Sequence, residues 1–220
     1  MTTLFEYPRN AIVGRVLPKS KIYEHASPNT ATKELFALQV EQITWQYKLA
    51  SETINLKGSQ SVPEIQVFSI ALKDGELKTE LLRCIDQAIP FPILYELKYD
   101  GKVKPVGAFK RPDKTNSVRW VSSEYFHGEW VPSDTPRTTL PVVLDLDALY
   151  AQLLIPLMPY QARSGEGLQT LVERMERIRL KQRELERCQT RLRKEKQFNR
   201  KVAINAELRD LNQELKGLTQ

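Results

Sequence analysis

Residues 168–218 read LQTLVERMERIRLKQRELERCQTRLRKEKQFNRKVAINAELRDLNQELKGL. Apolar residues recur here at heptad spacing, which is typical of helices that pack along a narrow seam. The first series is Leu168, Leu171, Met175, Ile178, Leu185 and Leu192, and the second is Ile204, Leu208, Leu211, Leu215 and Leu218. The second series is offset from the phase of the first by one residue. The offset fits an antiparallel hairpin of two helices or one long helix with a stutter.

We favour the hairpin, because a polar joint, Arg193–Lys201 (RKEKQFNRK), separates the two series. Phe198 is the only apolar residue of this joint. In the first series we assign Gln182 and Gln189 to the two remaining seam positions. Polar seam residues weaken self-packing and help to fix register or the choice of partner.

The net charge of the chain lies in this C-terminal part. Residues 161–220 hold 15 Lys and Arg against 9 Asp and Glu, which accounts for the whole net charge of +6. The first 160 residues carry 18 charges of each sign. Residues 174–201 alone contain 12 basic and 4 acidic side chains, so the positive charge concentrates near the predicted hairpin tip.

A basic helical tip can serve three purposes. It can contact a phosphate backbone, where each neutralised phosphate releases counterions. It can contact a helix of a protein partner, or it can be a solvated surface with a purely structural role. For the two contact interpretations, the candidate residues are Arg187, Arg191, Arg193, Lys194, Lys196, Arg200 and Lys201.

The first 160 residues mix helix and strand patterns without strict alternation, which favours an α+β fold. Residues 43–49 alternate apolar and polar side chains as a half-buried strand does, and residues 77–88 carry the apolar stripe of a helix. Asp100-Gly101 predicts a tight turn between two strands. Pro105 in the second of these strands predicts an edge position or a bulge, because proline lacks an amide donor.

We therefore expect an α+β globular domain over residues 1–160, with a mixed or antiparallel sheet and flanking helices. A basic antiparallel helical hairpin, similar to a coiled coil, is expected to follow over residues 161–220. The polar, glycine-containing stretch Gln161–Gly167 marks the boundary.

Several classes of function lack a signal in this sequence. No apolar run is long enough for a membrane span, and the N-terminus lacks the pattern of a signal peptide, so we expect a cytoplasmic protein that does not contact membranes. Cys84 and Cys188 do not predict a disulfide framework or a zinc site. Phosphate-binding glycine motifs are missing, and His25 and His127 stand far apart without cysteine neighbours. We expect neither a cofactor nor a bound metal.

One tripeptide could carry chemistry. Glu96-Leu97-Lys98 follows an apolar strand and resembles the ExK strand of restriction-type nucleases. In that chemistry two carboxylates hold Mg²⁺ and the lysine positions or activates water. Asp86 or Glu64 would then supply the second carboxylate. The other interpretation is a strand with alternating exposed Glu and Lys, and we favour it, so we expect no catalytic residues.

Several segments together resemble the prokaryotic domain-of-unknown-function family 4391. The resemblance rests on Glu41–Asn55 (EQITWQYKLASETIN), Val62–Val67 (VPEIQV), Ala88–Leu97 (AIPFPILYEL), Leu140–Leu154 (LPVVLDLDALYAQLL) and Lys194–Leu211 (KEKQFNRKVAINAELRDL). That family has no settled activity, so the resemblance transfers no catalytic residues to this chain. It implies a gene context near DNA methyltransferases and helicases of restriction or phage-defence systems.

The leading hypothesis is therefore a non-enzymatic accessory protein of such a system. It would dock to a helicase or methyltransferase partner, or to DNA, through the basic hairpin. A Mg²⁺-dependent nuclease using Glu96 and Lys98, and a self-associating structural protein, are the alternatives.

Overall fold

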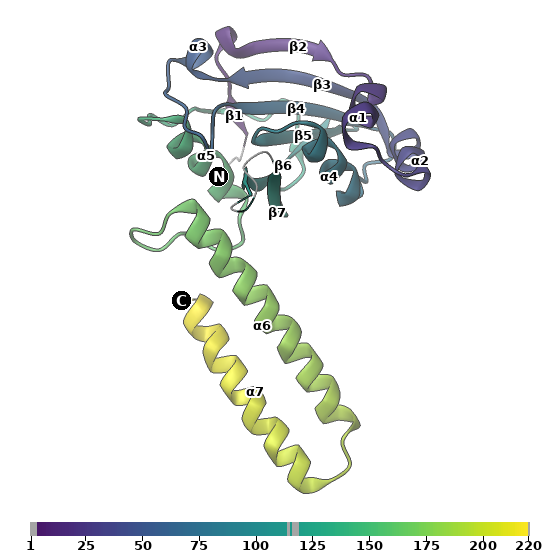
Figure 1. Ribbon diagram of the computed structural model, residues 1–220, viewed down its shortest axis with the longest axis vertical. Helices are drawn as coiled ribbons and strands as arrows, with labels where there is room; N and C mark the ends of the chain where they lie inside the picture. The colour runs from purple at the N-terminus through teal and green to yellow at the C-terminus, as the bar shows by residue number, and fades with distance from the viewer. Residues whose placement is uncertain (1–3, 114, 116–118, 220) are drawn as a thin grey trace. The chain divides into compact units, whose positions relative to one another are not determined.

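The computed structural model describes residues 4–113, 115 and 119–219. The chain divides into two compact units, Met1–Pro159 and Tyr160–Gln220. We call the first unit the body and the second the hairpin unit. The body contains a sheet with flanking helices, and the hairpin unit contains two long helices (Figure 1).

A mixed sheet forms the centre of the body. Its strands, in spatial order, are β2 (Ile12–Val16), β3 (Val40–Leu49), β4 (Ile65–Leu72), β5 (Ile93–Tyr99), β6 (Lys102–Pro112) and β7 (Trp120–His127). A short strand, β8 (Val131–Pro132), also pairs with β6. β4 and β5 are parallel, and the other pairs of this sheet are antiparallel. Because parallel neighbours need a crossover, a helix, α4 (Thr79–Ala88), connects β4 to β5.

Three helices cover one face of the sheet: α1 (Lys19–Ala26), α2 (Thr30–Gln39) and α4 (Figure 1). They bury Ile22, Phe36 and Leu81 against Phe68 and Tyr95 of the sheet. The Asn29 side chain caps α2 by accepting a hydrogen bond from the Thr32 amide at 2.8 Å. This cap satisfies an amide that the helix itself leaves unpaired.

The other face of the sheet packs against α5 (Leu146–Leu154) and the short 3-10 helix η2 (Ile155–Leu157). The Asp145 side chain caps α5 by accepting from the Ala148 amide at 2.8 Å. Gly107 of β6 permits close contact, since a Cβ atom there would lie 2.7 Å from Leu154 and 3.0 Å from Leu94. The remaining elements of the body are β1 (Phe5–Glu6), which pairs in parallel with β9 (Thr138–Thr139), η1 (Arg9–Ala11) and α3 (Ser51–Ile54).

Pro105 differs from its prediction. It lies in β6, which has neighbours on both sides, and it is opposite Glu96 of β5. The Pro105 carbonyl accepts from the Gly128 amide at 2.8 Å, so its backbone faces away from β5. The pairs with β8 end at Val103 and those with β7 begin at Val106, so the missing proline amide falls between these two ladders. A gap in the ladder thus tolerates proline inside the sheet.

The α+β class with a mixed sheet and packed C-terminal helices is confirmed. Within the described ranges, no helix combines the length and the apolar character that crossing a membrane requires.

Candidate partner-binding surface

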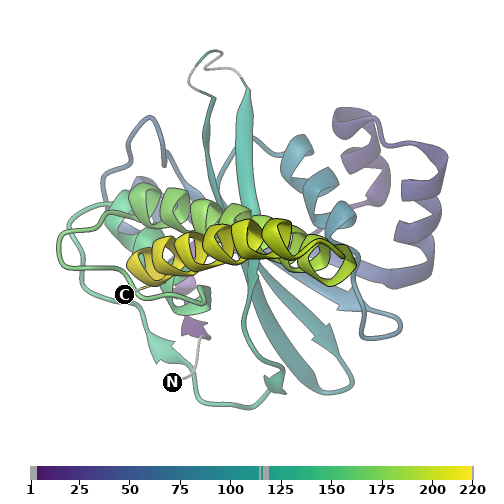
Figure 2. The same ribbon diagram turned by 90° about the horizontal axis from the view of Figure 1, so that it is seen from below.

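The hairpin predicted from the two heptad series is confirmed. α6 (Leu168–Lys194) and α7 (Phe198–Thr219) run antiparallel and lie side by side in both ribbon views (Figures 1 and 2). Residues 195–197 make the turn without glycine or proline. The Glu195 carboxylate accepts from the backbone amides of Lys196 at 2.8 Å and Gln197 at 2.9 Å, and these bonds hold the turn.

The seam of the hairpin differs from the predicted phase. Cys188 is 1% exposed and packs with Ile204 and Leu211, with Leu185, Leu192 and Leu208 around them. Gln182 and Gln189, which we assigned to the seam, are exposed. Half-buried Lys181 and buried Cys188 occupy the positions that continue the 3-4 spacing. After Ile178 the next apolar residue of the series is Leu185, seven positions on, so the sequence pattern alone could not choose between positions 181 and 182.

Ion pairs reinforce the seam along one side. Lys181 bridges to Glu214 of α7 at 2.9 Å and to Glu184 of its own helix at 3.0 Å. Nearer the tip, Arg191 pairs with Glu207 at 3.1 Å, and both side chains are exposed. The Lys181–Glu214 and Arg191–Glu207 pairs join the two helices.

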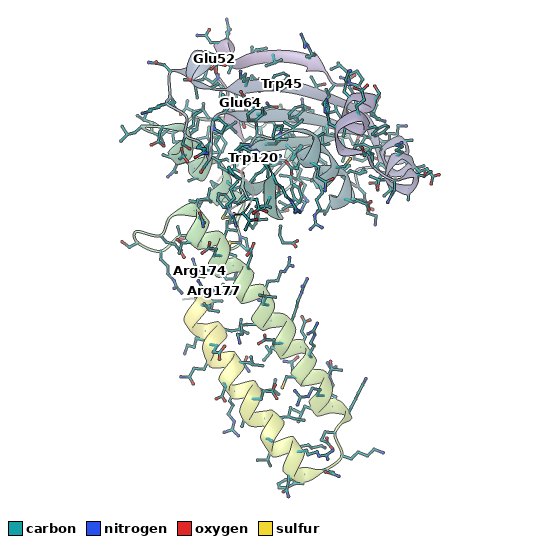
Figure 3. All side chains as sticks on the ribbon, in the orientation of Figure 1. Trp45, Glu52, Glu64, Trp120, Arg174 and Arg177 are labelled. Atoms are coloured by element: carbon teal, nitrogen blue, oxygen red, sulfur yellow. The ribbon has the colours of Figure 1, made fainter. Side chains whose placement is uncertain are left out.

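The base of the hairpin is held by two arginines. Arg174 is 4% exposed and donates two hydrogen bonds to the Glu166 carboxylate, a bidentate pair with distances of 2.7 and 2.8 Å. It also donates to the carbonyls of Leu218 at 3.0 Å and Gln161 at 2.8 Å. Arg163 donates to the Gly217 and Leu218 carbonyls as well. Figure 3 shows Arg174 beside the C-terminal end of α7.

These contacts place positive charge on carbonyls that the last turn of α7 leaves unpaired, which stabilises the helix end. The hydrogen bonds from Arg174 are the largest cause that lowers the pKa of Glu166, to about 2. Together, Arg163, Arg174 and Glu166 fix the end of α7 to the start of α6. We call these three residues the base clamp.

The seven predicted contact residues gather at the opposite end, where α6 and α7 meet. All of them are exposed: Arg187, Arg191, Arg193, Lys194, Lys196, Arg200 and Lys201. Among the described residues, six of the seven form no ion pair, and the exception is Arg191. Glu195 is the only acid between positions 187 and 206, and its pKa is lowered chiefly by the Gln197 amide and then by the Lys196 amide.

Helix stability explains only some of these cations. Arg193 and Lys194 end α6, where positive charge interacts favourably with the helix dipole. Arg200 and Lys201 lie in the first turn of α7, where positive charge is unfavourable and acidic residues are missing. The two cations therefore weaken the helix start, so helix stability does not account for them.

Phe198 is the only apolar residue of the predicted joint. The structure places it at the first position of α7, where it is 77% exposed. Val202, one turn later on the same side, is 50% exposed. An exposed large apolar side chain near exposed cations is a feature of binding surfaces.

The candidate catalytic residues are not brought together. Glu96 is on β5 and is 6% exposed, and both of its oxygens bind Arg137, at 2.6 and 2.9 Å. Asp86 is on α4 and packs on the face that Tyr95 and Leu97 contact. Side chains alternate along a strand, so Glu96 faces the other side of the sheet. Half-buried Lys98 follows near the end of β5.

Asp86 has a structural environment of its own. Its carboxylate lies 3.2 Å from the buried Lys110 ammonium and accepts from the Tyr125 hydroxyl. Lys110 also donates to the Asp86 and Ile89 carbonyls at the end of α4. Burial lowers the pKa of Lys110 and raises that of Asp86.

Glu64, the other candidate for a second carboxylate, binds Lys48 at 3.2 Å and accepts a hydrogen bond from the Gln66 side chain. In the described part of the chain, no three His, Cys, Asp or Glu residues are placed to hold a metal ion.

Comparison with known proteins gives a family but no characterised relative. No curated protein and no solved structure shows a significant match to this chain. A family model described as "Domain of unknown function (DUF4391)" matches residues 5–215. The match spans the sheet, α6 and most of α7, and the chain therefore belongs to the DUF4391 family.

Proposed function

We propose that this chain is a non-enzymatic accessory protein that docks onto a macromolecular partner through the tip of its basic helical hairpin. The partner would be a helicase or methyltransferase assembly of a DNA restriction or phage-defence system, or the DNA on which it acts. This context comes from the family resemblance, and the docking surface comes from the hairpin.

The observation that carries the proposal is the set of six exposed tip cations without ion pairs. Three other cations of the hairpin unit hold its fold: Arg163 and Arg174 at the base, and Lys181 at the seam. Six exposed cations around the single acid Glu195 leave a positive excess at the tip, which raises self-repulsion, so the tip gains most from an acidic partner.

The base clamp supports the proposal because it makes the hairpin a defined element. Cys188, Ile204 and Leu211 form a small buried cluster between the two helices, with half-buried Leu185, Leu192 and Leu208 packed around it. The clamp and the two bridging ion pairs reduce the freedom that binding would otherwise have to restrict. A preorganised surface binds more tightly than a flexible one with the same contacts.

The candidate nuclease residues favour a structural role. Glu96 is saturated by Arg137, and Asp86 is held by Lys110 and Tyr125 on the other side of the sheet. Each carboxylate thus compensates a buried or half-buried cation that would otherwise be unpaired.

The test is copurification from the native host. The variant Arg193→Glu/Lys194→Glu/Lys196→Glu reverses three tip charges, and we expect it to lose the copurifying partner. The control Arg9→Glu/Arg15→Glu/Lys102→Glu makes the same change in net charge at three exposed body positions. We expect this control to retain the partner. Equal retention by both variants would show that the tip is not the docking element.

A further inference from the structure

The hairpin has two long sides that differ in chemistry. The ion pairs Lys181–Glu214 and Arg191–Glu207 both join the helices, so they mark one side, which we call the ion-pair side. On α7 the acidic residues Glu207, Asp210 and Glu214 follow one another at helical spacing. They therefore form a stripe along the ion-pair side.

The other side of the seam carries amides and cations. On α6, Gln182, Gln189 and Arg193 form one stripe, and on α7, Lys201, Asn205 and Asn212 form another, and all six are exposed. We call these six residues the amide–cation face. Helical periodicity and the antiparallel pairing place the two stripes next to each other across the seam. Phe198 precedes the α7 stripe, and Arg209 and Lys216 continue along it. Glu186 is the one acid within the α6 stripe.

The antiparallel register places residues of the same chemical type at the same level on the two helices. Cys188 lies beside Ile204, and Lys181 lies beside Glu214. The same register sets Gln189 near the level of Asn205, and Gln182 near that of Asn212. Arg193 and Lys201 then fall together beside the turn. The face is thus two rows of amides that end in a pair of cations, and the Asn212 amide also donates to the Leu208 carbonyl of its own helix at 2.7 Å.

We infer that the amide–cation face binds duplex DNA. Lys and Arg contact phosphates, and Gln and Asn donate to phosphates or read base edges. The major groove admits one α-helix, so the stripe of one helix reads base edges there and the stripe of the other contacts the phosphate backbone. Carboxylates would repel phosphates, and α7 keeps all three of its carboxylates on the ion-pair side. This inference rests on the proposed docking role of the hairpin and specifies the partner and the side.

The amides favour DNA over two other polyanions. An acidic protein surface would be matched by cations alone and gives no reason for paired rows of Gln and Asn. The deep, narrow major groove of an RNA duplex is closed to side chains, so the same amides could not reach base edges there.

The test is fluorescence anisotropy of a labelled 20-base-pair DNA duplex with the full-length protein. The slope of log affinity against log salt is about −0.9 per phosphate neutralised. If Arg193, Lys201, Arg209 and Lys216 each neutralise one, the slope is about −3.6, and affinity falls about a hundred-fold from 50 to 200 mM salt. We expect Arg193→Gln/Lys201→Gln to reduce the slope by about 2.

The control is Arg177→Gln/Arg183→Gln, which removes two exposed α6 cations outside the face. We expect it to bind within about two-fold of the wild type, and an RNA duplex of the same sequence to bind at least ten-fold more weakly. Gln189→Ala/Asn205→Ala keeps every charge and should still weaken DNA binding several-fold. Far-UV circular dichroism checks that each variant keeps its helices.

Three results would overturn the inference: no DNA binding at 50 mM salt, equal losses in the control and the Arg193/Lys201 variant, or equal binding of RNA. The copurification test stays independent of them. If the wild type does not bind the duplex, but the tip charge-reversal variant still loses its copurifying partner, then the docking proposal stands and the assignment of DNA as the partner is wrong.

Discussion

Removing the charge of Glu166 should loosen the far end of α7 without touching the tip. Arg174 makes two bonds to this carboxylate, and both side chains are more than nine-tenths buried. The pKa of Glu166 is lowered from an ordinary value of 4.5 to about 2, which corresponds to about 3 kcal/mol. Allowing for solvent screening at the end of the hairpin, we expect a loss of about 2 kcal/mol in Glu166→Gln.

The assay is hydrogen exchange of the α7 amides, because local opening of the hairpin need not unfold the body. A loss of about 2 kcal/mol speeds exchange about thirty-fold at pH 7. Glu176→Gln, an exposed glutamate of α6, is the matched control and should change little.

The effect must also depend on pH with a definite sign. A carboxylate with a lowered pKa stabilises the fold fully above its unfolded value, and that stability is lost as the pH falls through the folded value. The difference between wild type and Glu166→Gln should therefore be constant above about pH 5 and shrink toward pH 2. Equal exchange in the two variants at pH 7, or a difference that does not change with pH, would refute the clamp.

Other consequences concern the body and the state of association. Glu96→Ala leaves Arg137 unpaired and should cost about 2–3 kcal/mol in denaturant unfolding, against little change for exposed Glu6→Ala. If the wild type cleaves plasmid with Mg²⁺ and a folded Glu96→Ala does not, the nuclease alternative is right. Lys110→Met leaves Asp86 buried without its cation and should cost about 3–5 kcal/mol; a loss below about 1 kcal/mol would contradict the role of this pair. Light scattering should give the mass of one chain at micromolar concentration, and a dimer abolished by Phe198→Ser would instead favour self-association.

Local patterns in the sequence predict most of the architecture. Asn29 and Asp145 cap the helices that they precede, and the alternation of residues 43–49 falls within β3. The one-residue offset and the polar joint between the two apolar series together favour the hairpin over one long helix with a stutter. These signals depend on neighbours within one or two turns, which a sequence displays directly.

Long-range contacts account for what the sequence does not show. Arg174 contacts Leu218, 44 residues away, and Arg137 contacts Glu96, 41 residues away. Nothing in the spacing of these residues indicates such pairs. From the sequence, Glu96 could therefore be taken for a catalytic residue, and the base clamp could not be predicted. The seam phase failed for another reason, since Lys181 and Gln182 are both polar and only the burial of Cys188 separates the two frames.

Lysine labelling of the native complex tests the docking claim most directly. Lys194, Lys196 and Lys201 lie at the tip, and Lys21 and Lys102 are exposed on the body as internal references. Acetylation of the complex, compared with the isolated protein, should show protection of the three tip lysines and unchanged labelling of the two body lysines. Full reactivity of the tip lysines in the intact complex would contradict the account.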